Sequence, residues 1–241
     1  MDKARGGLRV AHTPRNENHM ANGWLMIEEP TGNPKKSLAS RIAGIILASQ
    51  SPRREMLLEK LNIAFQVVPS RLAELPPMGE RPNAYAARMA LEKAVKVGQF
   101  FPDHLVIGAD TVVAIQDVIL GKPKSLPEAV LMLSRLSGQV HAVWTGICVY
   151  HARSGTEIVK AVSTAVRFRE LTQDEIDAYV QTGEPMDKAG AYAIQGLGKT
   201  LVRDLKGSYH NVIGLPTMEL GKILEEIGVP IDSQSIESSP G

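Results

Sequence analysis

Hydroxyl and cationic side chains near position 50 have the composition of an anion-binding site. Ser49, Ser51, Arg53 and Arg54 follow directly after the apolar run of residues 45–48. Arginine is unusual in the first turn of a helix, where free amides already carry partial positive charge. Two arginines, two hydroxyls and free amides together suit a phosphate group. We therefore predict a phosphate site here; the alternative is two solvated arginines on an ordinary helix.

Two more charged side chains interrupt apolar patterns. Asp110 lies between the apolar runs of residues 104–109 and 112–115, and a buried carboxylate is costly unless it is paired or functional. Lys93 lies on the apolar stripe of a helix predicted for residues 84–99, so it either extends its ammonium to solvent or points into a site. Asp110 is our candidate reactive carboxylate; the alternative is an acid that caps a loop at a strand bulge.

The residues around the first cluster predict a strand, a tight turn and a helix. The apolar run of residues 45–48 fits a buried strand. Ser51 offers an N-cap hydroxyl, and Pro52 suits the first helical position. The inward face of this helix would carry Leu57, Leu58 and Leu61.

The rest of the chain alternates strands and helices around one long hairpin. Further strands are expected at residues 65–68, 104–115, 118–120, 139–150, 157–168 and 200–204. Further helices are expected near residues 84–99, 126–136, 173–183 and 216–228, and residues 71–82 are expected to form a Pro-rich loop. This order predicts an α/β fold with a mixed β-sheet flanked by helices, elongated, with two lobes around a deep cleft.

The composition bounds the function classes. The chain has 241 residues, 44% hydrophobic and 22% charged, with a formal net charge of +1. Such a chain favours neither nucleic acid nor an anionic membrane as a partner, and a single cysteine, Cys148, fits a cytoplasmic location. We expect residues 1–43 to be a disordered extension, residues 44–230 the catalytic domain and residues 231–241 a flexible tail.

Several short segments in order resemble the Maf family of nucleotide pyrophosphatases. They are residues 47–54 (LASQSPRR), 92–94 (EKA), 108–113 (GADTVV), 121–123 (GKP), 136–138 (LSG), 183–196 (GEPMDKAGAYAIQG), 207–209 (GSY), 211 (N) and 214–216 (GLP). The resemblance implies a hydrolase acting on acid anhydrides. Such an enzyme converts a nucleoside triphosphate to the monophosphate and pyrophosphate with Mg²⁺ or Mn²⁺.

The resemblance also implies roles for individual residues. Asp110 matches the proton acceptor of the family, and Glu74, with Asp110, would hold the metal through hard carboxylate oxygens. Asp187 would line the same cleft as Lys188, unless these two form only a structural ion pair. The phosphate-binding set implied by the resemblance is Ser49, Ser51, Arg54, Lys93, Lys122 and Lys188.

Three positions bear on the substrate. Arg53, Thr111 and Gln195 match the branch that hydrolyses dTTP and UTP, where modified pyrimidine nucleotides are also candidate substrates. A Gln amide both donates and accepts hydrogen bonds, as O4 and N3–H of uracil or thymine require. The chain departs from relatives at Gln50, at His210 and at residues 71–73, where an acid often precedes the metal-binding glutamate. The alternatives are a 7-methyl-GTP pyrophosphatase and a non-enzymatic septum-formation regulator; the resemblance is also compatible with a homodimer.

Overall fold

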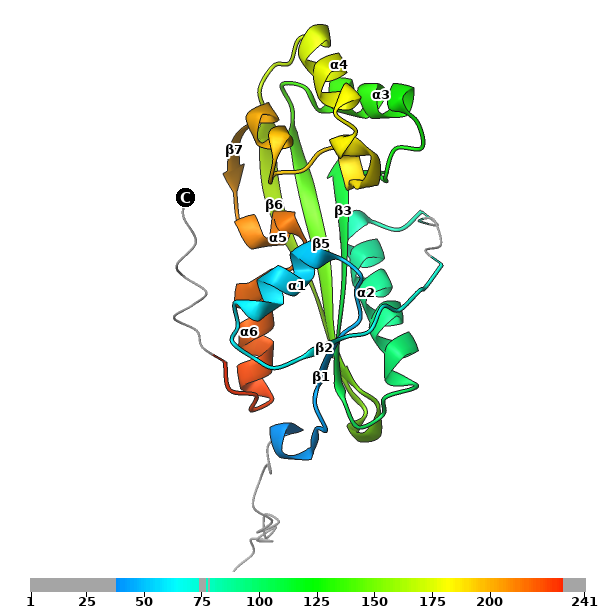
Figure 1. Ribbon diagram of the computed structural model, residues 1–241, viewed down its shortest axis with the longest axis vertical. Helices are drawn as coiled ribbons and strands as arrows, with labels where there is room; N and C mark the ends of the chain where they lie inside the picture. The colour runs from blue at the N-terminus through cyan, green and yellow to red at the C-terminus, as the bar shows by residue number, and fades with distance from the viewer. Residues whose placement is uncertain (1–37, 74–76, 78, 232–241) are drawn as a thin grey trace, which may run out of the picture. The chain divides into compact units, whose positions relative to one another are not determined.

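A computed structural model of the chain describes residues 38–73, 77 and 79–231 (Figure 1). The predicted metal ligand Glu74, most of the predicted extension and nearly all of the predicted tail lie outside the described residues. A short 3₁₀ helix, η1 (Leu38–Arg41), precedes the first strand. Leu38 and Ile42 pack against the core, so the packed part of the chain begins before the expected boundary at residue 44.

A mixed sheet of seven strands forms the centre of the described part. Its order is β2-β1-β3-β5-β6-β7, and β4 pairs with β3 beside that path. The pairs that β1 makes with β2 and β3 are parallel, and the pairs of β3 with β4 and β5, of β5 with β6 and of β6 with β7 are antiparallel. The strands are β1 (Ile45–Leu47), β2 (Gln66–Val67), β3 (Leu105–Ile115), β4 (Val118–Leu120), β5 (Val140–His151), β6 (Thr156–Phe168) and β7 (Val202–Lys206). The prediction of an α/β fold with a mixed sheet is confirmed.

Six α-helices and four further 3₁₀ helices accompany this sheet in the described residues. The α-helices are α1 (Pro52–Glu59), α2 (Pro82–Gly98), α3 (Leu126–Leu136), α4 (Gln173–Gln181), α5 (Tyr209–Ile213) and α6 (Thr217–Glu226). The 3₁₀ helices are η2 (Ala152–Ser154), η3 (Glu184–Asp187), η4 (Ala189–Ala191) and η5 (Leu197–Leu201). Within the described ranges, we find no helix with the length and apolar character needed to cross a bilayer.

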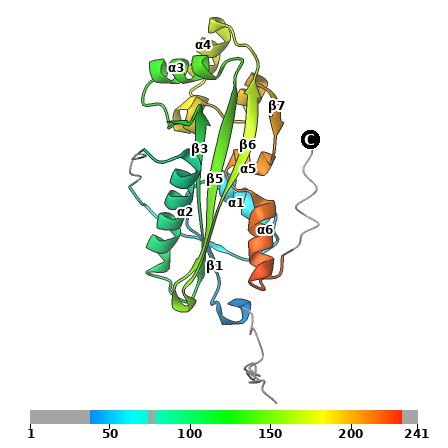
Figure 2. The ribbon, with the colours of Figure 1, turned by 180° about the vertical axis from the view of Figure 1, so that it is seen from behind.

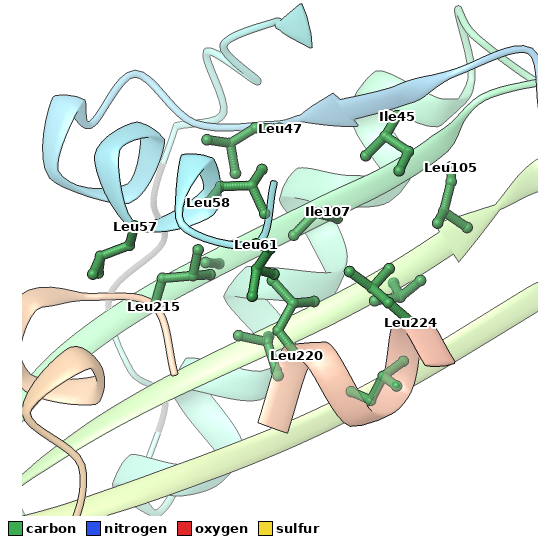
Figure 3. Packing of buried hydrophobic residues seen from close by; sticks show 14 of the residues in the cluster. Ile45, Leu47, Leu57, Leu58, Leu61, Leu105, Ile107, Leu215, Leu220 and Leu224 are labelled. Atoms are coloured by element: carbon green, nitrogen blue, oxygen red, sulfur yellow. The ribbon is translucent and has the colours of Figure 1, made fainter. Parts of the chain in front are cut away.

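Helices cover both faces of the sheet because alternate side chains of its strands point in opposite directions. Leu105 and Ile107 of β3 pack with leucines of α1 and α6, as Figure 3 shows, whereas Val106 packs with the alanines of α2. The view from behind (Figure 2) shows α2 and α6 on the two sides of the strands. A second core gathers Val113 and Ile115 of β3 with α3 and α4. The middle of β3 therefore lies between two cores.

Two glycines bring α2 unusually close to the sheet. A Cβ atom on Gly108 would lie 2.1 Å from the carbonyl oxygen of Ala90, and one on Gly146 would lie 2.1 Å from that of Ala86. Neither position can carry a larger side chain without a shift of the backbone. Because glycine has no side chain, the backbone of α2 lies directly against β3 and β5 at these positions. This short distance lets long side chains of α2 reach residues of the sheet.

Local signals predicted the starts of the longer helices, but they were wrong on the Ser51 cap and on the first residue of α2, and they did not predict the short helix α5. Pro52 occupies the first turn of α1 as expected, but the Ser51 side chain makes no capping hydrogen bond. The Oγ atom of Ser49 instead accepts a hydrogen bond from the Ser51 amide, at 3.2 Å. The capping box at Thr172 is complete. Helix α2 begins two residues before the expected position, at Pro82.

Candidate active site

A cleft of about 1180 Å³ opens beside the middle of β3. It is lined by every predicted site residue in the described part of the chain, namely Ser49, Ser51, Arg53, Arg54, Lys93, Asp110, Thr111, Lys122, Lys188 and Gln195. These residues come from the β1–α1 turn, α1, α2, β3, the loop after β4, and the segment between α4 and β7. The fold therefore collects groups from distant parts of the chain around one cavity.

A buried ion pair lies at the wall of this cleft. The Nζ atom of Lys93 donates to Oδ1 of Asp110 at 2.6 Å, and the two side chains are 10% and 9% exposed. Asp110 lies within the continuous strand β3 and pairs with Gly146 across the sheet, so the alternative of a loop-capping acid is wrong. Lys93 points into the site. The close approach of α2 at Gly146 explains why its ammonium reaches the sheet.

In the described part of the chain, the Arg54 guanidinium donates to acceptors on three different segments. Its Nε atom donates to the carbonyl oxygen of Gly214 at 2.8 Å, Nη2 to Oγ1 of Thr111 at 3.0 Å, and Nη1 to Oγ of Ser49 at 3.4 Å. Arg54 therefore connects the β1–α1 turn to β3 and to the loop before α6. A role in fixing the positions of Ser49 and Thr111 follows directly from these bonds, and phosphate binding by Arg54 stays a prediction.

Three other cations line the same cleft. Lys122 is exposed on the loop after β4, and Arg53 is half-buried in the first turn of α1. Lys188 forms an ion pair with its neighbour Asp187. A hydrogen bond from Lys188, with the charge of Arg53 as a smaller cause, lowers the pKa of Asp187. The Asp187–Lys188 ion pair exists and also lines the cleft, so both interpretations of these residues hold together.

Sequence reasoning missed the residues that hold the Gln195 loop. Glu184 accepts hydrogen bonds from the amides of Leu197 at 3.1 Å and Gly198 at 3.0 Å, and from the hydroxyl of Tyr179 at 2.9 Å. That hydroxyl also accepts the amide of Ala193 at 3.2 Å. Tyr179 and Glu184 thus fix the backbone on both sides of Gln195.

The pKa of Glu184 reflects these contacts. Burial acts to raise it, but the hydrogen bonds from the Gly198 and Leu197 amides and the Tyr179 hydroxyl together lower it. Glu184 is therefore a carboxylate whose hydrogen bonds hold a loop. The signal available in the sequence was an acid at the start of the polar loop that leads to Gln195.

Donor atoms for a metal are few in the described part of the site. Within residues 38–73, 77 and 79–231, no three Asp, Glu, His or Cys side chains gather as a metal site. Mg²⁺ is commonly held by only one or two carboxylates together with substrate phosphates and water. Asp110, on a cleft with room for a triphosphate, fits that mode of binding. Glu74, the second predicted ligand, lies outside the described residues.

The chain is similar over most of its length to proteins of one family. Residues 44–227 match the family described as Maf-like protein. A protein of Syntrophus aciditrophicus named dTTP/UTP pyrophosphatase is 46% identical over 184 residues, covering 76% of this chain and 90% of its own length. A Moorella thermoacetica protein of the same name is 47% identical over 187 residues, covering 78% and 96%. A solved nucleoside-triphosphatase/dITP/XTP pyrophosphatase of Mycobacterium abscessus is a remote match, with a TM-score of 0.40, 14% identity, and coverage of 76% and 94%.

Proposed function

The chain belongs to the Maf family, and from this premise we propose that it hydrolyses dTTP and UTP to the monophosphate and pyrophosphate. The observation that carries the proposal is the buried Asp110–Lys93 pair, at 2.6 Å, on a cleft lined by several further cations. Burying an ion pair is costly and contributes little to folding by itself. A pair placed at the wall of a cationic cleft therefore favours chemistry on an anionic substrate.

Asp110 is the proposed proton acceptor. A water molecule attacks the α-phosphorus, its proton passes to the Asp110 carboxylate, and the bond from the α-phosphorus to the bridging oxygen breaks to release pyrophosphate. The strand fixes the backbone of Asp110, and the hydrogen bond from Lys93 fixes the rotation of its carboxylate. A positioned base of this kind accelerates such a step by about 10²–10⁴-fold.

The cations of the cleft stabilise the charge that develops on the phosphate oxygens and the leaving group. Arg53, Lys122 and Lys188 line the cleft from three separate segments, so they can contact a triphosphate from several sides. Charges that are already in place need no reorganisation during the reaction, which makes such stabilisation effective.

A divalent cation completes the proposal. Asp110 would hold it together with Glu74, and Mg²⁺ or Mn²⁺ would supply charge neutralisation and a lowered pKa of bound water. Substrate choice is assigned to Thr111, Arg53 and Gln195, all of which line the cleft. Modified pyrimidine nucleotides, a homodimer and a cytoplasmic location stay predictions.

A triphosphate panel tests the proposed function. Purified protein with Mg²⁺ should release pyrophosphate from dTTP and UTP faster than from ATP, GTP or 7-methyl-GTP. Asp110→Asn should lose about 10²–10⁴-fold of this rate, and circular dichroism measured under the assay conditions separates this loss from unfolding. A preference for 7-methyl-GTP would reverse the role given to Gln195. A wild-type protein that leaves the whole panel intact would refute the enzymatic function.

A further inference from the structure

We propose that Thr145, a buried residue outside the cleft, fixes the Thr111 hydroxyl as a pure hydrogen-bond acceptor toward the substrate. This makes Thr145 a positioning residue for specificity, and the inference rests on the proposed function. The two threonines face each other across the β3–β5 ladder. Thr145 is fully buried, whereas Thr111 is partly exposed on the cleft.

The direction of each hydrogen bond follows from the acceptor at the end of the chain of contacts. Oγ1 of Thr145 lies 2.9 Å from the backbone carbonyl oxygen of Asn211. A carbonyl oxygen can only accept, and a hydroxyl has a single proton, so Thr145 donates that proton to Asn211. The 2.9 Å contact between the Thr145 and Thr111 hydroxyls then requires Thr111 to be the donor.

The same reasoning shows which hydrogen bonds the Thr111 hydroxyl can still make with a ligand. The Thr111 hydroxyl donates its proton to Thr145, and its oxygen accepts a hydrogen bond from Nη2 of Arg54 at 3.0 Å. A hydroxyl oxygen has two acceptor sites, so one acceptor site is left and no donor. Toward the cleft, Thr111 can therefore recognise only a group that donates a hydrogen bond.

The terminal acceptor is itself held firmly. Asn211 is fully buried, and its Nδ2 atom donates to the carbonyl oxygen of Val143 and to Oγ1 of Thr164, both at 3.0 Å. The backbone N–H of Asn211 donates to Oγ of Ser208 at 3.1 Å. The Asn211 carbonyl therefore cannot readily turn away from Thr145, and the direction of the whole chain of hydrogen bonds is fixed by the fold.

A fixed acceptor supplies discrimination that Gln195 cannot give alone. A glutamine amide can rotate by 180° and present either its donor or its acceptor to the same base edge, so it can satisfy uracil or cytosine. The imide N3–H of uracil and thymine is a donor, whereas N3 of cytosine is an acceptor. An acceptor-only Thr111 suits a substrate donor, which is the imide N–H of the base or a hydroxyl of the ribose.

Thr145→Val tests the inference because it keeps the shape and removes the hydroxyl. The Thr111 proton then loses its acceptor and can turn into the cleft. We expect the ratio of kcat/KM for UTP over CTP to fall about tenfold, the effect of one unmatched buried polar group. Thr145→Ser should restore the wild-type ratio. Thr217→Val is the matched control, because Thr217 is also buried and its hydroxyl bonds to Nδ1 of His210, outside the chain of hydrogen bonds from Thr111 to Asn211.

Parallel assays with dUTP and 3′-deoxy-UTP identify the donor on the substrate. A change confined to UTP over CTP assigns it to the base, and a change confined to the deoxy substrates assigns it to the ribose. If Thr145→Val folds and leaves all these ratios unchanged, the inference is wrong although the enzyme is active. If the wild type hydrolyses no triphosphate, the proposed function fails instead. Thr145→Ala removes the same hydroxyl and serves if the valine variant does not fold.

Discussion

Lys93→Met tests whether the buried ion pair is as costly to break as its geometry implies. Methionine keeps an unbranched chain of similar length and removes only the ammonium that contacts Asp110 at 2.6 Å. Both side chains are about nine-tenths buried, and removing one partner of such a pair typically lowers the free energy of unfolding by about 3–5 kcal/mol. Domains are stable by only about 5–15 kcal/mol, so Lys93→Met should bring this protein close to unfolding.

A double-mutant cycle separates the pair from its surroundings. Asp110→Asn removes the carboxylate charge, and the double variant Lys93→Met/Asp110→Asn removes both charges. If the two charges stabilise each other, the double variant loses about 1–3 kcal/mol less than the sum of the single variants. Urea denaturation measures each free energy of unfolding, and pyrophosphate release from UTP measures activity. Both single variants should lose about 100-fold or more of kcat/KM.

Lys96→Met on the same helix is the matched control for this cycle. Lys96 is more exposed, and its Nζ atom lies 3.4 Å from the carbonyl oxygen of Arg71. We expect little change in its unfolding free energy. The reasoning is refuted if Lys93→Met costs no more than this control, or if the losses of the two single variants simply add.

Two further predictions concern the loop of the cleft and the pH dependence of stability. Tyr179→Phe removes the hydroxyl that accepts the Ala193 amide, so the KM for UTP should rise about tenfold through a displaced Gln195, while Tyr150→Phe should leave it unchanged; equal effects would contradict the positioning role. The second of these predictions concerns pH: burial lowers the pKa of His141 from 6.5 to about 4. Between these values the unfolded chain binds a proton that the folded chain does not, so the free energy of unfolding falls as pH drops from 6.5 to 4. His141→Phe should reduce that slope in urea denaturation at pH 7 and 4.5, and an unchanged slope would exclude His141 as its source.

Local sequence patterns were sufficient where the determinant is local. The first apolar run, the Pro52 turn and the spacing of Leu57 and Leu58 predicted β1, α1 and the buried face of α1, because strand and helix periods are set by neighbours along the chain. Asp110 could be singled out because a carboxylate inside an apolar run needs a partner or a function. The predicted hairpin is confirmed as β5 and β6 for the same local reason.

Contacts between distant residues were outside the reach of these patterns. Arg54 and Gly214 are 160 positions apart, and their hydrogen bond depends on how α1 and the loop before α6 pack on the sheet. Periodicity allowed Lys93 either to reach solvent or to point inward. The choice was made by Gly108 and Gly146, which let α2 approach the sheet.

The sequence by itself determined the order of the seven strands and of the α-helices other than the short α5, the family, and which charged residues interrupt apolar segments. The tertiary structure alone decided which atoms these residues contact and in which direction their protons point. The physical reason is that helix and strand periods depend on a few neighbouring residues, whereas a hydrogen bond between Thr111 and Thr145 exists only after β3 and β5 have paired in one register.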